Sequence, residues 1–385
     1  MKEKNQLKLT ATTTFGLEGL VKEEVKKLGF KIDHVENGQI CFQSDFAGLV
    51  KANLWLRCAE RVLIKVDEFY AVDFDQLYEK TRKIPWEEWL DHDAEFPVTG
   101  KSVQSVLHSV PACQSIIKKA VVDKLKEKYK KNWFDESGPK YRIVFSIHKD
   151  RVILSIDSSG EGLHKRGYRD LSTSAPLQET LAAAMIYLSR WDPDRILIDP
   201  FCGSGTILIE TALICRNIAP GINRKFVSEQ WPQIPKTTWE NERNKAYNKI
   251  RNDRKPRLLM GMDRDDNLIK IARHHAERAG VSDLIHFQKN DFLDFQSSRD
   301  YAYIITNPPY GERLSEIKEV EELYKLMGKK LFPLETWSFY IISSHNDFES
   351  LFGKKASKRR KLYNGGIECQ YYQYYGPWPP KDHNN

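Results

Sequence analysis

The sequence predicts an α/β protein in which two small α/β units precede an open, mostly parallel sheet. Apolar stretches of strand length alternate with helical patterns along the 385 residues, a length that accommodates two or three domains. A glycine-rich turn joins a buried strand to a helix at residues 199–206. Polar residues also follow three later apolar strands, which is typical of a ligand site at one edge of a parallel sheet.

The composition fits a soluble globular protein of the cytoplasm. Hydrophobic residues make up 41% of the chain, and no apolar run approaches the ~20 residues that cross a bilayer. The first residues are charged and lack the apolar core of a signal peptide. The six cysteines form no C-x-x-C pair, so we expect neither a metal site nor disulfides. A net charge of +7 with 11% aromatic residues fits nucleic-acid binding, although many ordinary enzymes share these values.

The first predicted unit, residues 1–66, has the β-α-β-α-β rhythm of a ferredoxin-like sheet. Its expected elements are a strand at 7–13, a helix at 17–28, a strand at 39–42, a helix at 46–56 and a strand at 62–66. Gly29 is a typical helix stop, and Asp45 is a candidate N-terminal cap for the second helix.

The second predicted unit covers residues 67–160. We expect a helix over 73–90 that is interrupted at Pro85, and extended segments at 96–98 and 103–110 on either side of Gly100-Lys101-Ser102. A phosphate-binding P-loop is excluded there because its first glycine would fall at Glu95. An amphipathic helix over 115–129, a hairpin at 141–156 and a linker at 158–162 complete this unit.

Two explanations are available for each of two basic clusters in the sequence. Seven lysines surround the apolar face of the 115–129 helix, and they indicate either a solvated face or a phosphate-binding ridge. The densest basic cluster, residues 354–361, precedes a predicted C-terminal hairpin, and either a phosphate contact or a solvated loop explains it.

The third predicted unit, residues 161–385, begins with a basic, glycine-broken loop and a helix that ends near Arg190. A short strand at 196–198 then ends in Asp199-Pro200-Phe201-Cys202-Gly203-Ser204-Gly205-Thr206. Gly203 and Gly205 allow the backbone to turn sharply and to lie close to a ligand. A simple β–α turn would also carry two glycines, but the aspartate at the strand end favours a cofactor site.

Two further acids end the next strands. Asp263 follows the strand at 258–262, where a carboxylate commonly accepts from both hydroxyls of a ribose. Asp291 follows the strand at 285–288 and could accept from an adenine amine, with Phe292 packed nearby. A segment at about 217–256, with two tryptophans and many basic residues, lengthens the interval before Asp263 and leaves its assignment less secure. This insert either contacts RNA or covers the sheet.

The fourth strand, 301–305, delivers Asn307-Pro308-Pro309-Tyr310. Each proline fixes φ and removes a donor, so the turn presents acceptors in a rigid array beside an aromatic ring. Such an array is suited to a flat base that carries an exocyclic amine. A rigid turn with a packing tyrosine is the alternative, but the acids and glycines at three neighbouring strand ends favour a binding site. A fifth strand at 337–342 completes the parallel order.

This constellation resembles the Rossmann-like, class I methyltransferases that use S-adenosylmethionine and carry an N-terminal THUMP module for RNA. Among them it is similar to the bacterial 23S rRNA guanine-N2 methyltransferases. The residues that carry the resemblance are Leu163-His164-Lys165-Arg166-Gly167-Tyr168-Arg169, Ala175-Pro176-Leu177, the 199–206 turn and Asn307-Pro308-Pro309-Tyr310. The resemblance covers essentially the whole chain, and it implies a seven-stranded, mostly parallel sheet in the last unit.

The resemblance also implies roles for individual residues. The cofactor site would comprise Ala175, Leu177, Asp199, Phe201, Gly203, Gly205, Thr206, Asp263, Asp291, Phe292 and Asn307. Within it, Asp199 and the glycines would hold the methionine part, Asp263 the ribose and Asp291 the adenine.

Asn307, Pro308 and Tyr310 would act on the substrate. The Asn307 side chain and the Pro308 carbonyl would accept the amine hydrogens, and Tyr310 would stack on the extruded base. A pyrimidine C5 methyltransferase would need a nucleophilic cysteine, and we interpret Cys202 as a small packing residue instead.

We therefore expect methyl transfer to guanine N2, with 23S rRNA as the partner. Alternatives are a tRNA guanine-N2 methyltransferase, an adenine-N6 methyltransferase on RNA or DNA, and a non-catalytic RNA-binding ribosome-assembly factor. The last would carry a broken glycine turn or a broken Asn-Pro-Pro-Tyr motif, and both are intact.

Overall fold

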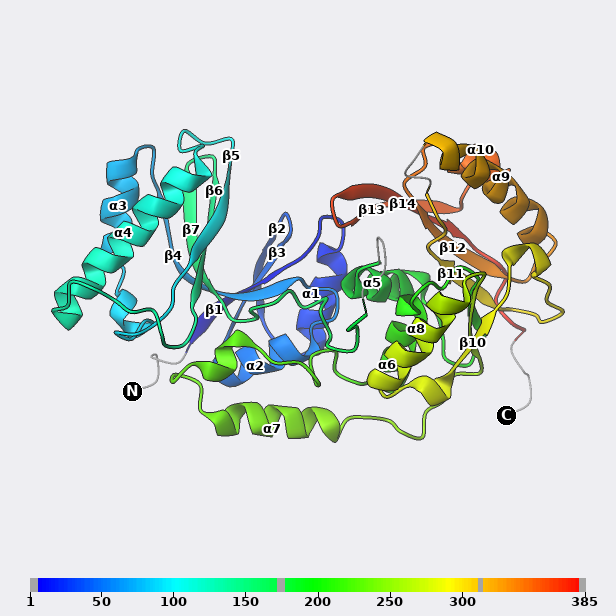
Figure 1. The fold of residues 1–385 in the computed structure, drawn as a ribbon, viewed down its shortest axis with the longest axis horizontal. Helices are drawn as coiled ribbons and strands as arrows, with labels where there is room; N and C mark the ends of the chain where they lie inside the picture. Colours follow the sequence, from blue (N-terminus) through cyan, green and yellow to red (C-terminus); the bar gives the residue numbers. More distant parts are fainter. Residues whose placement is uncertain (1–5, 172–176, 311–313, 381–385) are drawn as a thin grey trace. The chain divides into compact units, whose positions relative to one another are not determined.

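The computed structural model describes residues 6–171, 177–310 and 314–380, and its described strands form two sheets (Figure 1). The chain divides into two compact units. The first comprises Met1–Thr13, Val21–Leu163 and Lys225–Lys245, and the second comprises Thr14–Leu20, His164–Arg224 and Ala246–Asn385. Within the described ranges, no helix has the length and apolar character needed to cross a membrane.

The first unit contains a seven-stranded sheet in the order β2-β3-β1-β4-β7-β6-β5. Its strands are β1 (Leu7–Thr12), β2 (Ile32–Glu36), β3 (Gln39–Ser44), β4 (Arg61–Tyr70), β5 (Val98–Val103), β6 (Arg142–His148) and β7 (Arg151–Asp157). Its helices are α1 (Glu18–Lys27), α2 (Phe46–Trp55), α3 (Phe74–Arg82), the 3₁₀ turn η1 (Trp86–Glu88) and α4 (Val110–Tyr129). Asp45 caps α2, as predicted, because its side chain accepts from the Gly48 amide at 2.8 Å.

The two small α/β units share this one sheet through β4. The first residues of β4 pair with β1, and nearly its whole length pairs with β7, with an irregularity between Lys65 and Asp67. The boundary expected between residues 66 and 67 therefore lies inside a strand.

Two local expectations for the first unit were wrong, and one strand was not predicted. Gly100-Lys101-Ser102 lies within β5, which ends at Val103, and residues 104–109 form no strand, because α4 begins at Val110 with a proline in its first turn. A Cβ on Gly100 would come within 2.2 Å of the Phe145 carbonyl oxygen, so glycine serves close strand packing there. Strand β2 escaped prediction because it is largely exposed and lacks an apolar alternation.

The lysine stripe of α4 is substantially neutralised by acids of its own unit. Lys118 pairs with Glu136 at 2.5 Å, and Lys126 pairs with Asp123 at 3.4 Å. Lys124 lies 3.6 Å from Glu87. These pairs favour the interpretation of this stripe as a solvated face rather than a phosphate-binding ridge.

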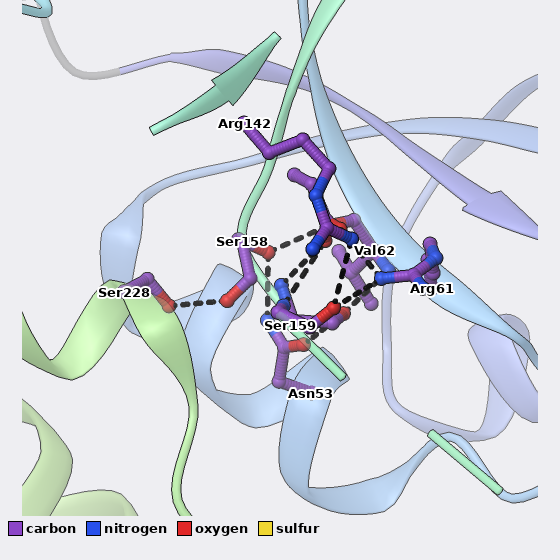
Figure 2. Close-up of polar contacts among 9 residues, drawn as sticks. Asn53, Arg61, Val62, Arg142, Ser158, Ser159 and Ser228 are labelled. Atoms are coloured by element: carbon purple, nitrogen blue, oxygen red, sulfur yellow. Dashed lines mark hydrogen bonds and ion pairs between the residues drawn. The ribbon is translucent and has the colours of Figure 1, made fainter. Parts of the chain in front are cut away.

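The segment expected to be a linker is instead an ordered junction (Figure 2). It begins at Asp157, the last residue of β7, whose carboxylate is buried. Arg61 and Arg142 lie 2.6 and 3.4 Å from this carboxylate, and the amides of Ser159 and Gly160 donate to it at 2.9 and 3.2 Å. Four donors thus hold one strand end.

Two buried serines continue this junction, as Figure 2 shows. Ser158 Oγ donates to the Val62 carbonyl at 2.7 Å and accepts from Asn53 at 2.9 Å. Ser159 Oγ donates to Asn53 Oδ1 at 2.7 Å and accepts from the Val62 amide at 2.8 Å. Ser228 Oγ donates to the Ser158 carbonyl at 2.7 Å. The serine-rich composition of this segment predicts an exposed loop. Instead, residues that are distant in the sequence contact the segment and bury it.

The second unit contains a seven-stranded sheet in the order β10-β9-β8-β11-β12-β14-β13. Its strands are β8 (Leu197–Asp199), β9 (Leu259–Asp263), β10 (Ile285–Lys289), β11 (Tyr303–Thr306), β12 (Ser338–Ser343), β13 (Lys358–Asn364) and β14 (Ile367–Tyr374). The pairings among β8 to β12 are parallel, and β14 is antiparallel to both β12 and β13. The predicted α/β class and mostly parallel sheet are confirmed.

The remaining described helices complete the fold, and the parts of them between Lys225 and Lys245 belong to the first unit. They are α5 (Glu179–Ser189), α6 (Thr206–Cys215), α7 (Lys236–Tyr247), α8 (Asp266–Arg278), α9 (Leu314–Leu331) and α10 (Phe348–Phe352), with 3₁₀ turns η2 (Val227–Gln230), η3 (Ser282–Leu284) and η4 (Phe292–Asp294). Aromatic side chains of α9, α10 and β14 pack together in the core, where Phe348 and Tyr372 stack at 4.5 Å.

The insert expected at about 217–256 contributes its middle part, Lys225–Lys245, to the first unit. Trp231 is 1% exposed, stacks on Tyr141 at 4.7 Å and donates to the Lys140 carbonyl at 2.9 Å. Trp239 is also buried, against Phe226. Both tryptophans therefore serve packing, and the middle of the insert covers the first unit rather than the second sheet.

Candidate active site

One cavity of about 1340 Å³ lies at the carboxyl ends of the parallel strands of the second sheet. It brings together nine of the predicted site residues: Leu177, Asp199, Phe201, Gly203, Thr206, Asp263, Asp291, Phe292 and Asn307. Gly205, Pro308 and Tyr310 lie next to lining residues but are not themselves part of the lining. Ala175 falls outside the described residues. Parallel strands expose their carboxyl ends at one sheet edge, which explains this convergence.

Asp199 ends β8 and is 1% exposed. Its Oδ1 accepts from Thr306 Oγ1 at 2.6 Å and from the Phe201 amide at 3.2 Å. Burial raises the pKa of Asp199 to about 7, because the two neutral donors only partly offset the loss of hydration. No arginine or lysine pairs with Asp199 within the described residues. Its charge is therefore available to a cationic ligand.

The glycine turn is shaped by its two glycines in different ways. Gly203 has φ +51°, lines the cavity and has no atom within 4 Å of the position of a Cβ, so its open side admits a ligand. Gly205 has φ +83°, and a Cβ there would lie 2.9 Å from the Phe287 ring. Gly205 therefore allows the turn to pack on the sheet, while Gly203 faces the cavity.

Asp263 and Asp291 end neighbouring strands on the same cavity. Asp263 accepts from the Gly203 amide and from the Asp265 amide, both at 3.0 Å, and burial raises the pKa of its carboxyl. Asp291 caps the η4 turn through the Leu293 amide at 2.9 Å. Each carboxylate retains further lone pairs for a ligand. The long insert does not displace Asp263 from the cavity.

A partly buried arginine positions two lining residues. Arg169 donates to the Leu177 carbonyl at 3.2 Å and to Thr206 Oγ1, and it lies 3.5 Å from Glu179. It thereby joins the segment before α5 to the first turn of α6. The basic 163–169 motif serves the interior of this unit, since Arg166 and Glu210 also form a buried pair at 3.4 Å.

Asn307 lines the cavity and lies immediately after β11. Its Oδ1 accepts a hydrogen bond from the Tyr310 hydroxyl, and Tyr310 Oη lies 4.0 Å from Cys369 Sγ. Burial raises the pKa of Tyr310, so its hydroxyl stays protonated. An amide oxygen has two lone pairs, and Asn307 can therefore accept from a substrate amine as well.

Tyr324 of α9 is a supporting residue that sequence reasoning missed. Its buried hydroxyl donates to the Pro309 carbonyl at 2.8 Å and lies 3.1 Å from Ser343 Oγ at the end of β12. Tyr324 thereby ties the Asn-Pro-Pro-Tyr turn to the core. The helical period places Tyr324 on the apolar face of α9, but no local signal reveals its partner.

Further lining residues also escaped prediction. Leu268 and Ile271 of α8 line the cavity, as do Lys318, Glu319 and Glu322 of α9. The spacing of Leu268 and Ile271 on one helical face indicates burial only, so it could not identify them. Cys202 is buried, and burial holds the pKa of its thiol well above the usual range, as expected of a packing cysteine.

Family comparisons match all three parts of the chain. Residues 166–373 match the family described as RMKL-like, methyltransferase domain. Residues 8–63 match the RlmL ferredoxin-like domain, and residues 71–157 match the THUMP domain.

Individual relatives agree with these matches. "Putative RNA methyltransferase YpsC" of Bacillus subtilis is 47% identical over 97% of both chains. A ribosomal RNA large subunit methyltransferase K/L of Syntrophotalea carbinolica is 34% identical over 94% of this chain, which spans 53% of that protein.

Two solved structures are similar over nearly the whole chain. A "predicted N6-adenine-specific DNA methylase" from Listeria monocytogenes has a TM-score of 0.91 at 48% identity, with 97% of both chains covered. SMU.472, described as a "putative methyltransferase complexed with SAH", has a TM-score of 0.91 at 41% identity, with 98% of this chain and 100% of that chain covered.

Proposed function

Because the chain belongs to the family of RlmL-like methyltransferases that carry a THUMP domain, we propose that it methylates the exocyclic N2 amine of a guanine in 23S rRNA. The methyl donor of this methyltransferase is S-adenosylmethionine. One observation carries the proposal: Asn307 lines the same cavity as Asp199, Gly203, Asp263 and Asp291. An amine acceptor and a cofactor pocket therefore share one space.

The lining fits S-adenosylmethionine, which supplies an electrophilic methyl group on a sulfonium ion when it is bound. Asp199 would hold the methionine ammonium, because a buried carboxylate without a basic partner is suited to a cation. Gly203 leaves open space beside it. Asp263 would accept from the ribose hydroxyls and Asp291 from the adenine amine, in line with the order of their strands.

Asn307 would activate the acceptor amine. The lone pair of an aryl amine is delocalised into the ring, so hydrogen bonds from the amine to Asn307 Oδ1 and to the Pro308 carbonyl favour a more nucleophilic nitrogen. Tyr310 would stack on the extruded base once its hydroxyl leaves Asn307. The proton can leave to water after transfer, so correct positioning supplies most of the rate enhancement.

Two carboxylates of α9 support guanine over adenine. Glu319 and Glu322 line the cavity that Asn307 shares. Guanine presents an N1–H donor beside its amine, whereas adenine presents an acceptor at the corresponding edge. A carboxylate accepts but does not donate, so it is the better partner for guanine.

Adenine N6 is the second candidate, because the same acceptor motif suits both amines and one similar structure is described as a predicted N6-adenine-specific DNA methylase. Transfer RNA is the alternative partner. Nucleoside mass spectrometry of 23S rRNA and tRNA, from cells with and without the protein, separates these candidates. We expect N2-methylguanosine to decrease in 23S rRNA alone. A decrease in N6-methyladenosine, or in tRNA only, would contradict the proposal.

A further inference from the structure

We infer that the C-terminal edge of the second sheet holds the RNA strand on one side of the target base. This surface, which we call the hairpin ridge, consists of Phe15, Lys355, Lys358, Arg360, Lys361 and Tyr363. The inference rests on the proposed function and identifies where that substrate lies. It concerns single-stranded RNA, because an extruded base needs neighbours that are free to leave a helix.

The ridge concentrates positive charge with few acids to neutralise it. Four of the six cations in the basic 354–361 cluster lie on β13, the edge strand (Figure 1). Lys361 pairs with Glu368 at 2.6 Å. In the part of the chain that the structure describes, Lys355, Lys358 and Arg360 form no ion pair. This contrasts with the lysines of α4, three of which face an acid.

An exposed aromatic ring and a half-buried one accompany these cations. Phe15 is 54% exposed and meets Tyr363 edge to face, with ring centroids 6.5 Å apart. The Lys361 ammonium lies 5.7 Å from the centre of the Tyr363 ring. Cations that track a backbone beside rings that stack on bases are the usual means of holding single-stranded nucleic acid.

A close backbone contact fixes Phe15 in this position. Gly16 has φ +92°, and a Cβ there would lie 2.9 Å from the Lys361 carbonyl oxygen. Only glycine allows the loop to lie so close to the edge of β13. The exposed Phe15 ring is thereby presented beside the hairpin.

One end of the ridge lies near the Asn-Pro-Pro-Tyr turn. The last residue of β12, Ser343, pairs with Gln370, so the hairpin residues up to Cys369 extend beyond the carboxyl end of β12. Leu362 pairs with Cys369, and Cys369 Sγ lies 4.0 Å from the Tyr310 hydroxyl. Tyr363, opposite Glu368, therefore lies at the cavity end of the ridge, and the cations continue from it along β13 to Lys358, opposite Gln373. A strand that delivers its base to Asn307 can follow this edge with the nucleotides on one side of that base.

Protection of a sheet edge is the competing explanation, because lysines on edge strands deter pairing with other chains. The Gly16 loop already covers the edge at Lys361. The cations also continue to Lys355, which precedes the strand. Protection of the edge would require neither Lys355 nor the exposed ring of Phe15.

The test compares two triple variants of the full chain that lose the same charge. The ridge variant is Lys355→Ala/Lys358→Ala/Arg360→Ala. The control is Arg251→Ala/Arg254→Ala/Lys255→Ala, whose exposed residues precede β9, a strand separated from β13 by four others in the sheet. Binding of a fluorescein-labelled single-stranded 16-mer RNA is measured over a salt series, and methyl transfer is measured on RNA from cells lacking the protein.

In the ridge variant we expect the slope of log affinity against log salt to become shallower by about 2, since each phosphate contact contributes ~0.7 for single strands. This change in slope corresponds to about a hundredfold weaker RNA binding at 0.1 M salt. The control variant keeps the wild-type slope, and both variants keep wild-type affinity for S-adenosylmethionine. Phe15→Ala should weaken binding by about fivefold or more without changing the slope.

Equal slopes in the ridge variant, the control variant and the wild type would overturn the inference. So would a ridge variant that sediments as larger assemblies and retains its RNA affinity, because that outcome indicates edge protection. A wild-type protein that methylates no RNA instead overturns the proposed function. The two failures are therefore distinguishable.

Discussion

Two buried aspartates, Asp157 and Asp199, end strands in different sheets and show how similar local chemistry serves different purposes. Both side chains are almost fully buried, and burial raises the pKa of both carboxyls. Asp157 meets two arginines and two backbone amides. Asp199 meets a hydroxyl and one amide, and it lines a cavity.

The partners, rather than burial, separate structure from function here. The carboxylate of Asp157 is satisfied by its own chain, so it stabilises the junction in which Ser158 and Ser159 are buried. The carboxylate of Asp199 lacks a cationic partner among the described residues. A buried charge without its counter-ion is costly, and a ligand that supplies the counter-ion recovers that cost on binding.

The largest expected effect comes from the cavity side of this comparison. Asn307→Ala removes the proposed acceptor of the amine hydrogens, so methyl transfer should fall by about a hundredfold or more. Affinity for S-adenosylmethionine and thermal stability should stay near wild type. Single-turnover transfer measures the first quantity, and calorimetry measures the second. Unchanged turnover would exclude the proposed role of Asn307.

The same substitution at the two aspartates tests the comparison itself. Asp199→Asn keeps an acceptor for Thr306 but removes the charge, so S-adenosylmethionine binding should weaken by tenfold or more while stability is retained. Asp157→Asn removes the charge beside Arg61 and Arg142, so the free energy of unfolding should fall by about 2 kcal/mol. Denaturant titration and calorimetry on both variants measure these effects. A loss of stability in Asp199→Asn, or weaker S-adenosylmethionine binding in Asp157→Asn, would contradict the comparison.

The pH dependence of cofactor binding is a further test of the role of Asp199 in this comparison. The pKa of Asp199 is raised to about 7, so protonation below pH 7 removes the charge proposed to hold the ammonium. Binding therefore favours the ionised form, and the dissociation constant should decrease by about tenfold from pH 6 to pH 8 and then level off. The Asp199→Asn variant supplies the control, because it should lack this component. An identical pH profile in both proteins would contradict the assignment.

The smallest expected effect concerns the support of the Asn-Pro-Pro-Tyr turn. Tyr324→Phe deletes the hydrogen bond to the Pro309 carbonyl, so we expect kcat to fall by about fivefold to tenfold with cofactor affinity unchanged. Ser343→Ala is the matched control, since it removes the other partner of the same hydroxyl and leaves the bond to Pro309. Equal losses of kcat in the two variants would indicate a general packing effect.

Much of the candidate site could be predicted because its residues follow apolar strands directly. Asp199, Asp263, Asp291 and Asn307 each stand at or just beyond a strand end, and parallel order brings such ends to one edge. To locate the cavity from the sequence, it is therefore enough to recognise the strands and to place the ligand site at their carboxyl ends.

Residues whose partners are distant in sequence could not be predicted. Tyr324 meets Pro309, which is fifteen positions away, through the fold of α9 onto the sheet. The 158–162 segment has the composition of a linker, but Asn53 and Ser228 bury it from more than a hundred and from seventy positions away. Composition reports local preference, and tertiary contacts override it.

The most direct test of the central claim is methyl transfer from radiolabelled S-adenosylmethionine to RNA from cells lacking the protein, with the wild type and Asn307→Ala compared. The wild type should label large-subunit rRNA, nuclease digestion should release the label as N2-methylguanosine, and the variant should leave the RNA unlabelled. Label in another nucleoside, or equal labelling by the two proteins, would contradict the claim that Asn307 presents a guanine amine to the cofactor cavity.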